Sequence, residues 1–111
     1  DTERISLVFE NFISNAFKYG FADTEIIICA RQINRAYVRF SIINFGSGIM
    51  DEEQAMVFDK FYRAPGQNGE GAGLGLSIAR QVVQAHEGRI GVLSEVGKIT
   101  EFYFDLPAPP V

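Results

Sequence analysis

The sequence predicts a two-layer α/β sandwich of the α+β class, with helices on one face of a mixed, mostly antiparallel sheet. Three observations lead to this prediction: an amphipathic helix at the start, a β-branched hairpin after it, and a second helix followed by a second hairpin. The length of 111 residues suits one domain with a single core. We therefore treat residues 1–111 as one domain.

The first helix is predicted over Thr2–Tyr19. Gly20 follows it at the position where glycine commonly ends a helix. Apolar residues recur here at spacings of three and four, which is typical of a helix with one buried face. They are Ile5, Val8, Phe9, Phe12 and Ala16.

Two strands come next, at Glu25–Ile33 and Tyr37–Ile43, and the Asn34-Arg35 turn between them favours a hairpin. Cys29 lies in the apolar run of the first strand. We interpret it as a small core residue in a reduced, cytosolic setting. A short helix with an acidic start is expected from Asp51 to about Phe58.

A glycine-rich loop, Pro65–Gly75, precedes the second long helix. That helix is predicted from Leu76 to His86, and Gly88 closes it. Strands at Arg89–Ser94 and Thr100–Leu106 then form the second hairpin.

Charge and hydropathy exclude some partners. Ten basic and fourteen acidic side chains give a net charge of −4, and no run of Lys or Arg occurs. A nucleic acid or an anionic membrane is therefore not an expected partner. No apolar stretch approaches the ~20 residues that cross a bilayer. We expect a cytoplasmic domain without direct membrane contact.

Asn11, Asn15 and Lys18 form one polar stripe on the first helix, at spacings of four and three. Such a stripe can simply be a solvated surface. Alternatively, amide oxygens can ligate Mg²⁺, and a Lys can meet phosphate as a point charge.

A second polar feature ends the second strand. Asn44 falls on the same face as Phe40 and Ile42, so a polar group ends an apolar row. Gly46 and Gly48 follow and permit close approach of the backbone. A simple turn is the alternative interpretation, but the inward position of Asn44 favours the floor of a pocket.

The third feature is Gly71-Ala-Gly73-Leu74-Gly75-Leu76, directly before a helix. Glycines at a helix N-terminus expose amide donors that suit phosphate, although a flexible linker is the alternative. The sequence contains no Gly-Lys-Ser/Thr, which excludes a P-loop. Before this loop, Phe58 and Phe61 suit core or hinge packing, and Arg63 is placed to reach an anion.

Taken in order, these features resemble the histidine-kinase branch of the GHKL, or Bergerat, nucleotide-binding fold. Asn11–Tyr19 resembles the N box of that family, and Asn44–Ile49 its first glycine box. Phe58–Arg63 resembles the F box, and Gly71–Leu76 the second glycine box. The resemblance covers nearly the whole chain.

The resemblance implies an enzyme: an ATP-binding catalytic domain that transfers the γ-phosphoryl group of ATP to a histidine nitrogen in two-component signalling. Asn15, helped by Asn11, would hold Mg²⁺ and, with Lys18 and Arg63, would serve catalysis. Arg63 would approach the γ-phosphate. The remaining implied nucleotide contacts are Tyr19, Asn44, Gly46, Gly48, Ile49, Phe61, Gly71, Gly73, Leu74, Gly75 and Leu76.

The implied partners are ATP, a separate histidine-bearing dimerisation domain and, indirectly, a response regulator. An inner-membrane sensor is one possible parent protein. The acceptor histidine would lie in that separate domain, so His86, the only histidine, is interpreted as structural. The family's domain usually begins with strands upstream of Asp1, so we expect an edge that these strands would otherwise pair.

This sequence departs from the family at Asn44, where Asp usually accepts a hydrogen bond from the adenine amino group. An amide oxygen can still accept, but loss of the charge should cost about 1–2 kcal/mol, or roughly 5–30-fold in affinity. Ile99 and Glu101 replace small or hydroxyl residues, which bears on packing.

Three alternatives remain open. The first is a degenerate nucleotide-binding regulatory module without phosphotransfer, which Asn44 favours. The second is an ATPase of the same fold, although Asn11 stands where those relatives carry a catalytic Glu. The third is a kinase of the same fold that phosphorylates serine on a partner.

Overall fold

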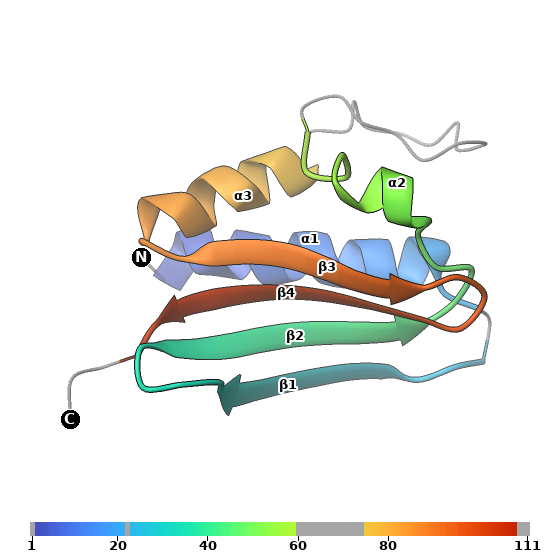
Figure 1. Ribbon diagram of the computed structural model, residues 1–111, viewed down its shortest axis with the longest axis horizontal. Helices are drawn as coiled ribbons and strands as arrows, with labels where there is room; N and C mark the ends of the chain where they lie inside the picture. Colours follow the sequence, from blue (N-terminus) through green and yellow to red (C-terminus); the bar gives the residue numbers. More distant parts are fainter. Residues whose placement is uncertain (1, 22, 60–74, 109–111) are drawn as a thin grey trace.

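The computed structural model describes residues 2–21, 23–59 and 75–108 (Figure 1). Its helices and strands follow the predicted order. They are α1 (Thr2–Tyr19), β1 (Ile26–Gln32), β2 (Tyr37–Phe45), α2 (Asp51–Gln54), α3 (Gly75–Ala85), β3 (Arg89–Glu95) and β4 (Ile99–Pro107). None of the helices in these ranges has both the length and the apolar character needed to cross a membrane.

Two elements differ from the prediction by two or more residues at one end, whereas the other ends agree within one residue. The β2 strand runs two residues further and includes Asn44 and Phe45, because β4 pairs with it along this whole stretch. The α2 helix ends at Gln54 rather than near Phe58. Beyond Gln54 the chain turns through hydrogen bonds between residues three positions apart. The Met56 amide donates to the Glu53 carbonyl, and the Asp59 amide donates to the Met56 carbonyl.

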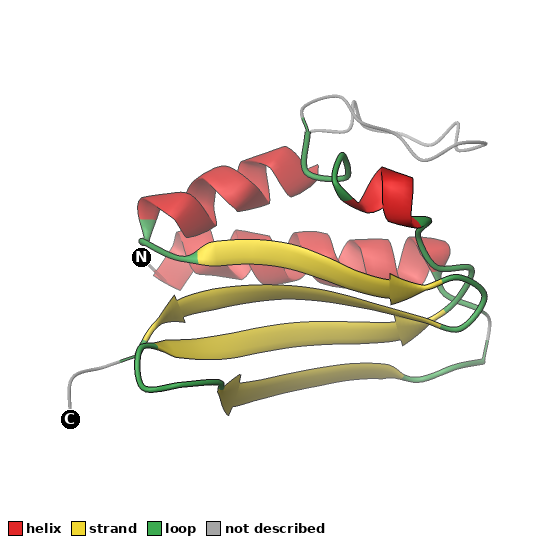
Figure 2. Ribbon diagram, viewed as in Figure 1, coloured by secondary structure: helices red, strands yellow, loops and turns green. Residues whose placement is uncertain are grey.

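The sheet has the order β1-β2-β4-β3, and all three described pairings are antiparallel (Figure 2). The helices α1 and α3 lie side by side over one face (Figure 1). This confirms the predicted sandwich with its helices on one face. Among the described residues, β1 pairs with β2 alone, and every β1 residue except Ile26 is exposed.

The core lies between α1, α3 and the two central strands. From α1, Val8 and Phe12 are fully buried, and the Phe12 ring centroid lies 5.4 Å from that of Phe102 on β4. Ala79 and Val83 close the core from α3. Because these contacts join residues far apart in the sequence, they fix α1 against β2 and β4.

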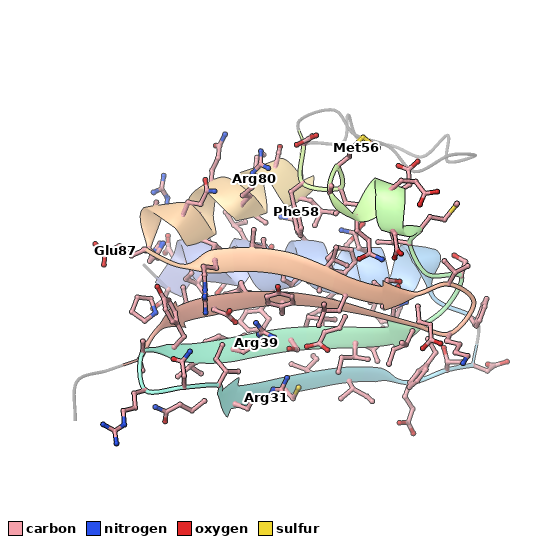
Figure 3. The ribbon with its side chains drawn as sticks, viewed as in Figure 1. Arg31, Arg39, Met56, Phe58, Arg80 and Glu87 are labelled. Carbon is pink, nitrogen blue, oxygen red and sulfur yellow. The ribbon has the colours of Figure 1, made fainter. Side chains whose placement is uncertain are left out.

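Phe58 and His86 lie at the edge of this core. Phe58 is buried, as expected, with its ring centroid 6.3 Å from that of Phe102 (Figure 3). His86 follows α3 directly, and its Nδ1 lies 2.7 Å from the carbonyl oxygen of Val82. This placement agrees with a structural histidine at a helix end.

The interpretation of Cys29 as a core residue is wrong. Cys29 is exposed. Its neighbour Ile28 pairs with Ile42, a buried core residue, so alternation directs Cys29 to the face away from the helices. No described element covers this outer face beside β1, and an apolar run on such a strand is therefore only partly buried.

Polar and aromatic side chains occupy the outer face instead. Asp105 is only 1% exposed because Arg39 binds it through two nitrogens, at 2.8 and 3.1 Å, and Arg89 binds it at 3.2 Å. The hydrogen bond to Asp105 is the main cause that raises the pKa of Arg39 above its usual value. Arg31 lies opposite Arg39 on β1 (Figure 3). Glu101, one of the departures from the family, accepts a hydrogen bond from Ser41 on β2 at 2.7 Å.

Gly46 and Gly48 lie in the connection between β2 and α2, and both approach the backbone of the segment that joins β3 to β4. The Gly46 amide donates to the Lys98 carbonyl at 3.2 Å. Gly48 has φ +77, and an added Cβ would lie 2.8 Å from the carbonyl oxygen of Glu95. The close approach predicted for these glycines is therefore made to the β3–β4 turn.

We predict that Gly48→Ala is much more destabilising than Gly97→Ala. Both glycines have positive φ, which costs an alanine ~1–2 kcal/mol. A Cβ at Gly97 would meet nothing within 4 Å, whereas one at Gly48 would meet the backbone of the turn. Overpacking should add ~1–3 kcal/mol at Gly48. Urea unfolding of both variants measures the difference, and equal losses would contradict the proposed packing.

Candidate nucleotide-binding site

A pocket of about 290 Å³ opens where α1 ends beside the neighbouring ends of β1 and β2. This volume is near the lower limit of small-molecule pockets, ~300–1,000 Å³. It suits one ring system rather than a whole nucleotide. The lining residues are Ala16, Phe17, Gly20, Phe21, Asp23, Thr24, Ile26 and Asn44.

The pocket exists because side chains become smaller along the buried stripe of α1. Phe12, Ala16 and Gly20 follow one another at spacings of four, so they lie on one helix face. The Phe12 side chain is fully buried above the sheet, whereas Gly20 has no side chain. An added Cβ at Gly20 would lie 3.6 Å from Nδ2 of Asn44 and 2.6 Å from the Ala16 carbonyl oxygen. The helix end therefore leaves open the space above Asn44.

Asn44 is the polar group at the bottom of this pocket. Its side chain is on the helix-facing side, two residues after the fully buried Ile42, as the alternation of β2 predicted. Asn44 is 3% exposed, yet no hydrogen bond among the described residues uses its amide. A buried amide normally has partners for its oxygen and its NH₂ group. The pocket is the place where a ligand can provide them.

The segment after α1 forms one wall of the pocket and is fastened to β2. The Phe21 amide donates to the Phe45 carbonyl at 2.7 Å, and Gly20 forms a bridge with Gly46. Thr24 Oγ1 donates to the Phe21 carbonyl at 2.6 Å. The aromatic rings of Phe17 and Phe21 remain largely exposed. An exposed ring beside a pocket can pack against a planar ligand.

Hydroxyl groups from β3 and β4 lie beside Asn44. Ser94 Oγ donates to the Ile99 carbonyl at 3.0 Å and accepts from the Ile49 amide at 2.8 Å. Ser94 Oγ also lies 2.8 Å from Thr100 Oγ1, a hydrogen bond in which either hydroxyl can donate. Thr100 is buried and is the direct cross-strand partner of Asn44.

Sequence reasoning missed several of these groups, chiefly Phe21, Thr24 and Thr100. Phe21 and Thr24 could have been noticed because they follow the helix-ending Gly20 and precede a strand. The alternation of the last strand could have placed Thr100 on the inner face. The sequence offered no signal that Thr100 would be opposite Asn44, because that depends on strand register.

The predicted stripe on α1 lies near the pocket but outside its lining. Asn11 and Asn15 are half-buried, and Asn15 directly precedes the pocket residue Ala16. Asn11 Nδ2 donates to the Leu7 carbonyl at 2.9 Å, and no hydrogen bond within the described part of the chain uses its Oδ1. Two carboxamide oxygens fit Mg²⁺ when phosphates and water supply the remaining ligands. Lys18 and Tyr19 belong to α1, but their side chains are outside the description.

Several other predicted nucleotide contacts lie in α3 or in the connection between β2 and α2. Gly75 is the first residue of α3, and Leu76 packs against the core. The Ile49 amide is bound to Ser94, and Gly46 and Gly48 hold the β2–α2 connection. The remaining predicted contacts lie outside the described residues: Phe61, Arg63, Gly71, Gly73 and Leu74.

Known proteins are similar to this chain in sequence and in architecture. Residues 1–110 match the family described as histidine kinase-, DNA gyrase B-, and HSP90-like ATPase. Drug sensory protein A of Synechocystis sp. is 39% identical over 110 residues, which cover 89% of this chain and 17% of that protein. The chain thus spans less than a fifth of that relative's length.

Two solved structures are also similar. The mycobacterial sensor histidine kinase MprB has a TM-score of 0.90 at 28% identity, covering 100% of this chain and 76% of that one. Full-length ShkA in complex with AMPPNP has a TM-score of 0.84 at 32% identity, covering 97% of this chain and 22% of that one. Together with the family match, these likenesses confirm the resemblance drawn from the four sequence motifs. The chain belongs to the histidine kinase-, DNA gyrase B-, and HSP90-like ATPase family and has the fold of a histidine-kinase catalytic domain.

Proposed function

We propose that this chain binds Mg²⁺-ATP and transfers its γ-phosphoryl group to a histidine on a separate dimerisation domain. The observation that carries the proposal is the buried Asn44 amide, which lacks a partner within the described protein and faces a pocket of ring size. The complex of ShkA with AMPPNP, an ATP analogue, supports the choice of nucleotide.

In this proposal the adenine ring occupies the pocket above Asn44. The amide oxygen of Asn44 accepts a hydrogen bond from the adenine amino group, and Phe17 or Phe21 packs against the ring. The apolar surface of Ala16 and Ile26 excludes water around the base. The protein thus fixes the base, which in turn fixes where the triphosphate extends.

The triphosphate would extend toward the middle of α1 and the beginning of α3. Asn15 and Asn11 would hold Mg²⁺, which neutralises phosphate charge when bound. Lys18, Tyr19 and Arg63 are assigned to nucleotide contacts, with Arg63 at the γ-phosphate. The α3 helix begins at Gly75, and free amides at a helix N-terminus suit phosphate. These groups act by positioning and by charge, which is the main requirement of phosphoryl transfer.

The acceptor histidine is assigned to another domain. His86 Nδ1 lies 2.7 Å from a backbone carbonyl oxygen, and His86 follows the C-terminal end of α3, whereas the pocket lies beside the C-terminal end of α1. A histidine-bearing dimerisation domain of the parent protein would supply the acceptor, and a response regulator would receive the phosphoryl group afterwards. The parent would work in the cytoplasm or as an inner-membrane sensor.

A regulatory module that binds nucleotide without phosphotransfer is the second candidate. Asn44 favours it, because a neutral amide binds adenine more weakly than a carboxylate does. Binding and transfer therefore require separate measurements.

We predict that calorimetric titration with Mg²⁺-ATP will show binding that is about tenfold tighter in Asn44→Asp, because a charge-assisted bond is roughly twice as strong as a neutral one. Asn34→Asp is the matched control. Its side-chain oxygen accepts from the Ala36 and Tyr37 amides in an exposed turn, as Asp also can. Absence of ATP binding to both the folded chain and Asn44→Asp would overturn the assignment of the pocket.

Phosphotransfer is tested with γ-labelled ATP and the histidine-bearing domain of the parent protein. We expect label to reach that domain, and we expect Asn15→Ala to slow transfer by at least ~100-fold through lost charge neutralisation. Ser14→Ala, on the exposed side of α1, should transfer normally. If ATP binds but no label is transferred, the regulatory-module reading replaces the kinase.

A further inference from the structure

We infer that Asn44 broadens the range of bases that the pocket accepts, so that purine nucleotides with a carbonyl at C6 bind about as well as ATP. The inference rests on the proposed function, because it concerns the same pocket. It goes beyond that function in assigning Asn44 the role of a specificity-determining residue.

A carboxamide and a carboxylate differ in the hydrogen bonds that they can form. A carboxylate can only accept hydrogen bonds, so at this position it attracts a 6-amino group and repels a 6-oxo group. A carboxamide has both an acceptor, Oδ1, and two donors on Nδ2. Turned one way, Asn44 accepts from the adenine amino group. Turned the other way, it donates to a C6 carbonyl.

The surroundings leave both orientations of the amide open. No hydrogen bond to a described residue holds Oδ1 or Nδ2 of Asn44, and neither atom is sealed from the solvent of the pocket. Its strand neighbours are Ile26, which is apolar, and Thr100, whose Oγ1 lies 2.8 Å from Ser94 Oγ. Neither neighbour forms a hydrogen bond with the Asn44 amide that would hold it in one orientation.

The space above Asn44 is also open, and its one acidic neighbour in the described lining is exposed. Gly20 lies over the amide and contributes no side chain, and an added Cβ there would lie 3.6 Å from Nδ2. Asp23 is the one acidic residue in the lining of the described pocket, and it is exposed, so solvent screens it. A 6-oxo group at the bottom of the pocket thus meets no fixed negative charge.

The deciding experiment compares ATP with inosine triphosphate, which differs from ATP only at the C6 substituent and the N1 proton. Both nucleotides, with Mg²⁺, are titrated calorimetrically into the 111-residue chain, Asn44→Asp and the surface control Asn34→Asp. We expect the two dissociation constants to agree within about tenfold for the chain and for Asn34→Asp. In Asn44→Asp their ratio should rise by at least another tenfold in favour of ATP, because a carboxylate repels the carbonyl.

The outcomes separate the two proposals. If the chain binds ATP and rejects inosine triphosphate as strongly as Asn44→Asp does, the broadened base range is wrong and the proposed function stands. If the ratio rises in Asn44→Asp but not in Asn34→Asp, Asn44 sets the base selectivity. If the folded chain binds neither nucleotide, the proposed function fails and takes this inference with it.

Discussion

The packing of α1 against the inner faces of β2 and β4 is the contact on which the rest of the structure depends. Phe12 meets Phe102 and Phe104 with ring centroids 5.4 and 5.9 Å apart, and all three side chains are at most 3% exposed. Burial of aromatic side chains of this size dominates the energetics of a small core. The contact also fixes the height of the helix above the sheet, and so the depth of any space left at its end.

The pocket follows from that fixed height. Further along α1 the large ring gives way to Ala16 and then Gly20, while on the sheet below the apolar row gives way to Asn44. The two changes occur at the same place because the core packing fixes the position of α1 along β2. The Asn44 amide thus comes to lie at the bottom of an open pocket without a hydrogen bond to a described residue, where water or a ligand can reach it. Its place at the bottom of the pocket suits binding of a ligand.

Much of this could be predicted from the sequence because the relevant periods are local. The spacing of Val8, Phe12 and Ala16 places the buried helix face, and the alternation Phe40, Ile42, Asn44 places the amide inward. Cys29 could not be placed in this way, since the sequence of a strand does not show which of its faces is covered. The register that sets Thr100 opposite Asn44, and the buried ion pairs of Asp105, also depend on contacts between distant segments.

The central claim is that the Asn44 amide reads the base of a bound nucleotide. Nitrogen-15 NMR of the labelled chain observes the side-chain NH₂ group of this residue directly while Mg²⁺-ATP is added. The account predicts large shifts for that group and for the backbone amides of Gly20, Phe21 and Thr24, with the backbone amides of Arg31 and Arg39 unchanged. Nucleotide binding that leaves the Asn44 NH₂ resonances in place while those of the outer face move would contradict it.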